Sequence, residues 1–233
     1  INFEQNVLKE VVGSQDQIAA VYGGFNKIVF KTNGNFVVNK LSISKKRIEN
    51  LNKNLLLVYT GYKRTAHSIA KSYVNKLKSS KEKNILKILS FVKEGEKILK
   101  DGHLNDFGRL LHESWLEKKR LSSLISNSSI DDIYNRAFRN GALGGKLLGA
   151  GGGGFFLVYC PIENQKKLRF CLNKLKEILF KTQFDCVPVI ERLKPFQPVA
   201  MNVFTSQLNL ADVVEPACHF ALASALVAAR EVA

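Results

Sequence analysis

The chain has 233 residues, of which 45% are hydrophobic and 24% charged, the ordinary composition of a folded globular protein. Its longest apolar stretch, Ala217 to Ala229, is too short to span a bilayer, so we expect a cytoplasmic protein without a membrane helix. The net charge of +15 comes from residues 1–195 and favours anionic partners. The lysines are dispersed along amphipathic segments without a nucleic-acid-binding pattern, so we expect neither nucleic acid nor a membrane as a partner.

The first part of the chain has the two-residue period of strands. Strands are predicted at 27–31, 36–41 and 55–60, where β-branched and aromatic residues gather. The dipeptide Asn33-Gly34 lies between the first two and adopts positive φ readily, so it predicts a turn.

Beyond Gly61 the period changes to that of a helix. Apolar residues three and four positions apart form four successive stripes, which run through 66–77, 85–92, 104–115 and 130–137. We therefore expect a group of helices after the third strand.

A strand, a helix and a further strand are predicted next, at 155–160, 163–181 and 186–190. The helix would turn four leucines inward, at positions 168, 172, 175 and 179. This unit on a bed of earlier helices predicts an α+β layer architecture. After Pro195 the sequence is rich in alanine and nearly free of lysine, so we place a boundary there. Its final helix, at about 212–232, would dock on the body or mediate association, for example as a homodimer.

The segment from Gly144 to Tyr159, "GGKLLGAGGGGFFLVY", has seven glycines in sixteen residues and ends in an apolar strand. Glycine loses more entropy on folding than any other residue, so the segment must need positive φ or close backbone approach. A glycine-rich loop can hold phosphate with its amides, and Lys146 would add charge, but a tight sheet corner is an equal alternative. The segment is not a Walker A loop, because Gly-Lys-Ser/Thr is missing at its end. It is not a dinucleotide-binding loop either, because we predict no strand before it and no helix after it.

A second segment, "GSQDQIAAVYGGFN", spans Gly13 to Asn26. Ser14 stands three residues before Gln17, the spacing of a capping box, so a helix should begin at Gln15. Asp16 would lie in its first turn, where the helix dipole favours a carboxylate by about 0.3–1 kcal/mol. Asp16 either only complements that dipole or acts as a general base toward a hydroxyl group.

A third segment, "YTGYKRTAHSIA", places Lys63 and Arg64 between a strand and a helix. Arginine binds phosphate through two parallel hydrogen bonds, so this pair is a candidate phosphate contact. Two surface cations in a connecting loop are the equal alternative.

The cysteine and histidine positions predict no metal site. The cysteines lack paired spacing, so neither a zinc site nor a disulfide framework is expected, and the histidines share no ligand spacing. The residues concerned are Cys160, Cys171, Cys186, Cys218, His67, His103, His112 and His219.

Taken together, these segments resemble the GHMP kinases, the family of galactokinase, homoserine kinase, mevalonate kinase and phosphomevalonate kinase. The resemblance is carried by "QDQIAAVYGGFN", "TGYKR", "LHESW" and "GGKLLGAGGGGF" and covers about Val11 to Lys194. The sequences of these motifs are most similar to those of bacterial D-glycero-D-manno-heptose 7-phosphate kinases. This likeness implies ATP-dependent phosphorylation of the C1 hydroxyl of that heptose, toward nucleotide-activated heptose and lipopolysaccharide.

The resemblance also implies a division of the chain. It makes 1–54 a remnant of the N-terminal domain, 55–194 a ferredoxin-like C-terminal domain of helices on an antiparallel sheet, and 195–233 an unmatched tail. The implied catalytic residue is Asp16, and the implied partners are ATP and a sugar phosphate. The implied ATP- and phosphate-binding residues are Lys146, Gly149, Ala150, Gly151, Gly152 and Gly153. The implied substrate-binding residues are Gly23, Gly24 and Arg64.

One family feature is absent from the chain, namely the phosphate loop with the pattern Pro…Gly-Leu-Gly-Ser-Ser. The sequence begins at Ile1 without a signal peptide, and we expect this start to be a cut. The loop and the serine and glutamate that hold Mg²⁺ are therefore expected upstream, and we predict no catalysis by the chain alone. Two alternatives stay open: a kinase for fucose or galactose, and a non-catalytic sugar-binding module.

Overall fold

The computed structural model describes most of the chain up to Lys181. The described residues are 6–9, 13–31, 33–62, 66–76, 80–173 and 178–181. The predicted strand at 186–190, the boundary at Pro195, the tail at 195–233, and both Lys63 and Arg64 lie outside them. None of the described helices is long and apolar enough to cross a membrane.

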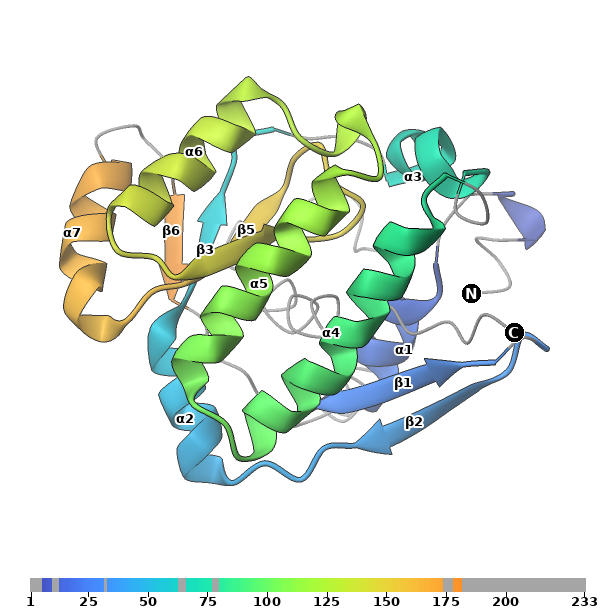
Figure 1. Cartoon of the computed structure of the whole chain (residues 1–233), viewed down its shortest axis with the longest axis horizontal. Helices are drawn as coiled ribbons and strands as arrows, with labels where there is room; N and C mark the ends of the chain where they lie inside the picture. The colour runs from blue at the N-terminus through green and yellow to red at the C-terminus, as the bar shows by residue number, and fades with distance from the viewer. Residues whose placement is uncertain are drawn as a thin grey trace, which may run out of the picture.

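The described strands form two antiparallel sheets (Figure 1). In the smaller sheet, β1 (Asn26–Phe30) pairs with β2 (Phe36–Lys40) through the predicted turn, where Gly34 has a φ of 85°. The larger sheet has the order β4-β5-β3-β6. Its strands are β3 (Leu55–Tyr59), β4 (Gly144–Leu147), β5 (Phe155–Tyr159) and β6 (Ile178–Lys181).

Helices cover the larger sheet, which confirms the predicted α+β class. Helix α5 packs on β4, and α4 packs on α5 (Figure 1). The helix bounds are α1 (Gln15–Tyr22), α2 (Lys45–Asn54), α3 (Ala66–Val74), α4 (Glu82–Lys100), α5 (Leu104–Lys119), α6 (Ser128–Arg139) and α7 (Ile162–Asn173). Three of the four predicted apolar stripes lie within α4, α5 and α6, and α3 covers the stripe at 66–77 as far as Val74.

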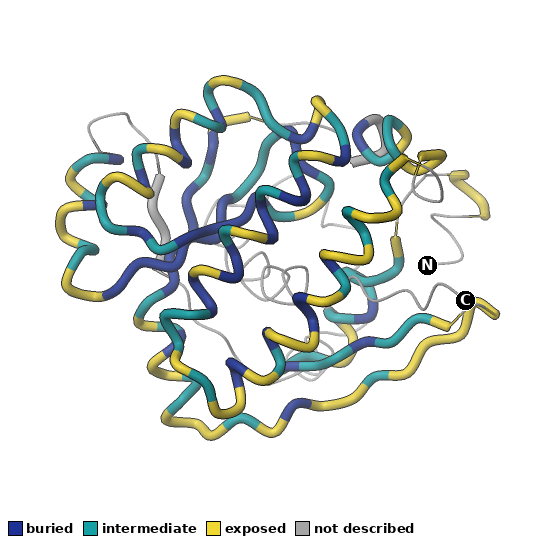
Figure 2. The backbone as a smooth tube through the Cα atoms, in the orientation of Figure 1, coloured by how far each residue is buried: buried dark blue, intermediate teal, exposed yellow. Residues whose placement is uncertain are grey.

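Strands β3, β4 and β5 of the larger sheet are buried on both faces along nearly their whole length (Figure 2). Successive side chains of a strand point to opposite faces, so β3 contributes to two cores. Leu56 packs with Trp115 in one core, together with residues of α6 and α7. Leu57 packs with Phe107 in the other, together with residues of α2 and α4.

The structure corrects the secondary-structure prediction in three places. Helix α7 ends at Asn173, and residues 178–181, which we predicted as helix, form β6 beside β3. A short apolar run has no period that separates helix from strand, and the ladder hydrogen bonds of β3 decide the outcome. The helix α2 and the strand β4 were not predicted, because α2 buries only Leu51 and β4 begins with two glycines.

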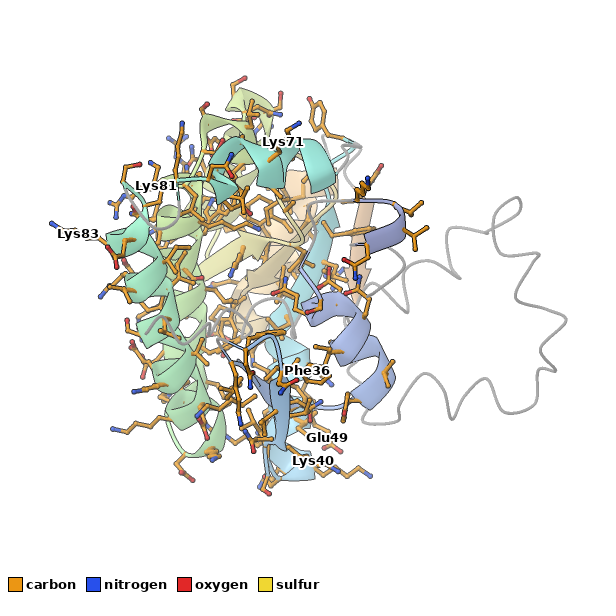
Figure 3. All side chains as sticks on the ribbon, turned by 90° about the vertical axis from the view of Figure 1, so that its right-hand side faces the viewer. Phe36, Lys40, Glu49, Lys71, Lys81 and Lys83 are labelled. Atoms are coloured by element: carbon orange, nitrogen blue, oxygen red, sulfur yellow. The ribbon has the colours of Figure 1, made fainter. Side chains whose placement is uncertain are left out.

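The dispersed lysines lie mainly on solvated helix surfaces. Lys71 and Lys83 are exposed, and Figure 3 shows Lys83 pointing away from the molecule. These positions support the expectation that the lysines are exposed to solvent on separate helix surfaces and do not gather into one patch.

Candidate functional site

The loop between β4 and β5 needs the backbone freedom of glycine. Gly149, Gly151, Gly152 and Gly154 have φ values of 63°, 118°, 74° and 93°. L-residues with a side chain rarely adopt such angles, whereas glycine does so readily. These angles fit both a phosphate-binding loop and a tight sheet corner. The contacts of the loop are therefore needed to distinguish the two.

The glycines of β4 have a different reason. A Cβ atom on Gly144 would lie 2.0 Å from the carbonyl oxygen of Gly108 in α5. A Cβ atom on Gly145 would lie 2.7 Å from the carbonyl oxygen of Leu157 in β5. These two glycines therefore let α5 and β5 approach the backbone of β4, which fixes α5 relative to the loop.

Backbone hydrogen bonds hold the end of the loop from two sides. The amide of Gly152 donates to the carbonyl of Ile125 over 2.8 Å, and that of Gly154 to the carbonyl of Tyr62 over 2.9 Å. Thr60 donates to the carbonyl of Gly154 through both its amide and its hydroxyl. Among the described residues, the amides of Gly149, Ala150 and Gly153 make no hydrogen bond.

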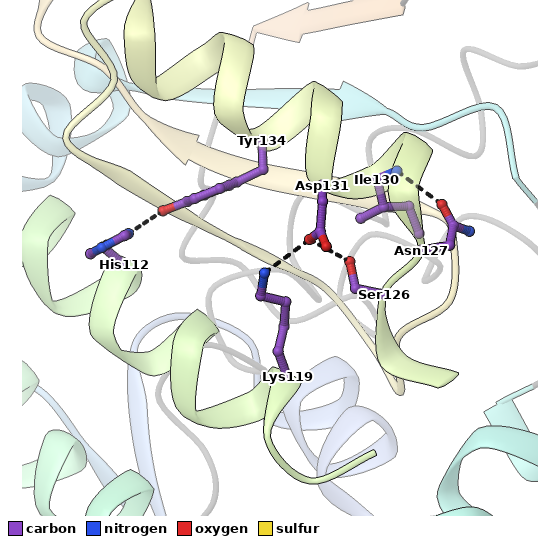
Figure 4. Close-up of polar contacts among 7 residues, drawn as sticks. All are labelled: His112, Lys119, Ser126, Asn127, Ile130, Asp131 and Tyr134. Carbon is purple, nitrogen blue, oxygen red and sulfur yellow. Dashed lines mark hydrogen bonds and ion pairs between the residues drawn. The ribbon is translucent and has the colours of Figure 1, made fainter. Parts of the chain in front are cut away.

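The segment that supplies Ile125 is itself fixed by side chains at the start of α6 (Figure 4). Lys119 and Ser126 both donate to Asp131, over 3.0 and 2.8 Å. Asn127 caps α6 by accepting from the amide of Ile130. The loop therefore lies against a braced support, which favours a defined shape over a flexible turn.

A lysine that the sequence did not single out joins α5 to the loop. The ammonium of Lys118 donates to the carbonyls of Leu147 and Gly149, over 2.9 and 2.5 Å. Its side chain is buried, and this burial holds the pKa of Lys118 well below its ordinary value. The nearby charge of Lys146 lowers that pKa further, and the carboxylate of Asp16 acts in the opposite direction.

Lys146 projects from β4 and is also buried. Burial lowers the pKa of its ammonium to about 8, because desolvation disfavours the charged form. Within the described part of the chain, this ammonium makes no hydrogen bond or ion pair. Because buried charges are normally paired, a buried ammonium without a described partner favours binding of an anion.

Asp16 lies in the first turn of α1, as predicted, and close enough to Lys118 for their charges to interact. The predicted capping box is wrong, because the side chain of Ser14 makes no cap hydrogen bond. Ser14 has a φ of −100° and a ψ of 3°, not the extended conformation that directs a cap oxygen to the helix. Helix α1 is held through Ile18, which packs on Ile28 of β1.

Gly23 and Gly24 end α1 and lead into β1. Their φ values are 58° and 70°, and Asn26 donates from its side chain to the carbonyl of Gly23 over 2.6 Å. The turn by itself explains both glycines, and close approach of a sugar there remains a prediction. Arg64 lies outside the described residues, so its predicted role also remains untested.

The structure thus places Lys118 against the glycine loop, close enough to Asp16 and Lys146 for their charges to act on it. Lys118 was missed, although it stands three residues after Trp115 on the apolar face of α5. A lysine in an apolar stripe is a signal, because lysine is rarely buried without a partner.

The site does not fit a divalent metal ion by itself. The described residues contain no group of three or more His, Cys, Asp or Glu side chains that could hold one. Mg²⁺ prefers carboxylates and water, whereas this cluster has one carboxylate beside two ammonium groups. Any Mg²⁺ that takes part in catalysis needs ligands from elsewhere.

Comparison with known proteins finds a family match for part of the chain that includes the glycine loop. Residues 96–180 match the family model described as GHMP kinases C terminal. The chain is 36% identical over 175 residues to a D-glycero-alpha-D-manno-heptose 7-phosphate kinase of Campylobacter jejuni, covering 73% of this chain and 51% of that kinase. It is 28% identical over 184 residues to a bifunctional fucokinase/GDP-fucose pyrophosphorylase of Arabidopsis thaliana, covering 73% of this chain and 17% of that protein.

A solved structure of a mevalonate kinase has a fold similar to that of this chain. The mevalonate kinase of L. major matches with a TM-score of 0.57 and 19% identity, over 70% of this chain and 50% of that one. The chain therefore spans at most about half the length of the proteins it matches here.

Proposed function

We propose that the chain is part of an ATP-dependent sugar kinase, because residues 96–180 match the family model described as GHMP kinases C terminal. The proposed acceptor is the C1 hydroxyl of D-glycero-D-manno-heptose 7-phosphate, and the product is a 1,7-bisphosphate for nucleotide-activated heptose and lipopolysaccharide synthesis. The observation that carries the proposal is the charge interaction of Asp16 with Lys118, which is bonded to the glycine loop. A candidate base and a candidate phosphate site thereby lie together.

Phosphoryl transfer depends mainly on positioning and on stabilising charge. In the proposed mechanism Asp16 orients the C1 hydroxyl and accepts its proton. The amides of Gly149, Ala150 and Gly153, which have no partner among the described residues, bind phosphate oxygens. Lys146 stabilises the negative charge that develops, because its buried ammonium faces little competing solvent.

The remaining assignments follow from the same proposal. We propose 1–54 and 55–194 as parts of the two kinase domains, with Gly23, Gly24 and Arg64 near the sugar phosphate. ATP and the sugar phosphate are the proposed partners, the cytoplasm is the proposed location, and Mg²⁺ would be held by residues that this chain lacks. We also propose that the 233-residue chain tested alone does not transfer phosphate, because the family's phosphate-loop pattern does not occur in it.

A kinase for an unphosphorylated sugar is the second candidate. The similarity to a bifunctional fucokinase/GDP-fucose pyrophosphorylase over 73% of this chain supports it. The two candidates differ at the 7-phosphate, which needs a cationic contact that a free sugar does not. Lys63 and Arg64 are the proposed contact, so their substitution should affect only the heptose kinase.

The test is ATP consumption by the protein expressed from the start codon of its own reading frame. The acceptors are heptose 7-phosphate, fucose, galactose and mannose, and the matched variants are Asp16→Asn and Asp101→Asn, an exposed aspartate at the end of α4. We expect turnover on heptose 7-phosphate alone, a loss of at least about 10²-fold in Asp16→Asn, and no change in Asp101→Asn.

Other results discriminate among the alternatives. Turnover on a free sugar would keep the kinase and replace the acceptor. Sugar binding without turnover on any acceptor would make the protein a binding module and leave Asp16 as a residue of the helix dipole.

A further inference from the structure

Lys118 is a buried cation whose two hydrogen-bond partners are the last residue of β4 and a residue of the glycine loop. It projects from the last turn of α5, and its ammonium donates to carbonyls at the end of β4 and at the first loop residue with positive φ. The neighbouring Glu117 and Arg120 pair with each other and not with Lys118. Its bonding is therefore directed at the loop and not at the helix surface.

The two bonds fix the direction of a peptide group. In a planar trans peptide the C=O of one residue and the N–H of the next point in opposite directions. Because Lys118 binds the carbonyl of Gly149, the amide of Ala150 is turned away from Lys118. That amide makes no hydrogen bond to a described residue, and a Cβ atom on Gly149 would meet no atom within 4 Å. The amide thus has no partner among the described residues, and the glycine before it has no atom near its Cβ position.

Charge at the site favours the same arrangement. The charged groups whose fields act on Lys118 are Lys146 from β4 and Asp16 from α1. Two ammonium groups with one carboxylate leave a positive excess in a buried place. An incoming oxyanion lowers the repulsion between the lysines, and Asp16 lowers it in the absence of one.

We propose that Lys118 is the positioning residue of the loop, which turns the amide of Ala150 outward so that it can bind a phosphoryl oxyanion. The loop-positioning part stands on the contacts alone, and the oxyanion part rests on the function proposed above. Lys118 acts through the loop and does not contact the reacting atoms in this scheme.

The first test follows hydrogen exchange of single amides in the 233-residue chain. The variants are Lys118→Met, Lys118→Arg and the control Lys83→Met, which removes an exposed lysine of α4. In Lys118→Met we expect the bonded amides of Gly152 and Gly154 to exchange about ten- to a hundred-fold faster, because two charge-assisted hydrogen bonds are lost. Lys83→Met should leave these rates unchanged, and Lys118→Arg should restore part of the protection.

The amide of Leu57 in the central strand β3 serves as the reference for global unfolding. Unchanged exchange of the loop in Lys118→Met would overturn the proposal. Equal acceleration of the loop and of Leu57 would also overturn it, because Lys118 would then only stabilise the whole domain.

The second test titrates inorganic phosphate and follows the ¹⁵N–¹H signal of Ala150. A phosphate-dependent shift that is weakened in Lys118→Met supports the whole proposal. A loop that loosens in the variant without phosphate binding in either protein would support the positioning role and refute the phosphate site. In the full reading frame, Lys118→Met should lower kcat at least tenfold with little change in the KM for the sugar, and an effect on KM alone would contradict the proposal.

Discussion

Strand β4 and the loop that follows it use the same residue for opposite reasons. In β4, Gly144 stands where a side chain would strike the backbone of α5, and its φ is not positive. In the loop, Gly149 and Gly154 have positive φ, but a side chain on either would meet no atom within 4 Å. Gly144 is therefore needed because there is no room for a side chain, whereas Gly149 and Gly154 are needed because the backbone there has a positive φ.

The difference separates the fold from the site. The glycines of β4 let a helix and a strand pack closely, which any variant must preserve to fold. The loop glycines set the direction of amides that have no partner among the described residues. Substitutions of the β4 glycines should therefore act on stability, and substitutions of Gly149 and Gly154 in the loop should act mainly on binding.

The largest effect is expected for Gly144→Ala. Its Cβ atom would lie 2.0 Å from the carbonyl oxygen of Gly108, and neither backbone can move without displacing α5 from β4. We expect the free energy of unfolding to fall by more than about 3 kcal/mol, measured by urea denaturation.

Gly13→Ala is the matched control, because a Cβ atom there meets nothing within 4 Å and the φ is not positive. Its stability should be unchanged or slightly higher. A loss below about 1 kcal/mol in Gly144→Ala would show that α5 and β4 are less tightly packed than the structure indicates.

A smaller effect of opposite sign is expected for Lys146→Met. The folded state holds the pKa of Lys146 at about 8, below its ordinary value, so the charged form is disfavoured by folding. Between pH 8 and about 10.4 the unfolded chain binds more protons than the folded one, and stability rises with pH across this window. Removing the charge should therefore stabilise the protein at pH 7 by up to about 3 kcal/mol.

Thermal or urea unfolding of both proteins at pH 7, 9 and 10.5 checks this prediction. The advantage of the variant should shrink above pH 8 and nearly vanish at about pH 10.5, where the lysine is neutral in the folded state and about half deprotonated in the unfolded state. A constant advantage at every pH would instead indicate better packing by methionine. A less stable variant at pH 7 would mean that the ammonium has a partner which compensates its burial.

Much of the fold could be predicted from the sequence, because its main elements carry their own period. The hairpin strands were predicted to within one residue, since β-branched and aromatic residues fill them. Helix α2 was missed because only Leu51 is buried, and residues 178–181 were assigned to a helix because their pairing with β3 is not a local property.

The site was less predictable than the fold. The glycine run indicated an unusual backbone conformation. Residue type alone does not distinguish Gly144, which is needed for packing, from Gly149, which is needed for a positive φ. Asp16 was found by resemblance, whereas Lys118 was missed, because its role depends on carbonyl groups about thirty residues away that no sequence pattern records. Local residue types set the elements, and their packing sets the site.

The smallest effect on stability is expected for Gly149→Ala, and it would sharpen the comparison with β4. The φ of 63° strains an alanine by about 1–2 kcal/mol, but no atom obstructs its side chain. The matched variant Gly149→Asn should lose less, because asparagine tolerates the left-handed region. In both variants inorganic phosphate, followed at the amide of Ala150, should bind more weakly in proportion to the lost stability, since strain relaxes by turning the peptide that Lys118 holds. If Gly149→Ala were as damaging as Gly144→Ala, the loop would also be tightly enclosed, and the distinction between the packing and the loop glycines would fail.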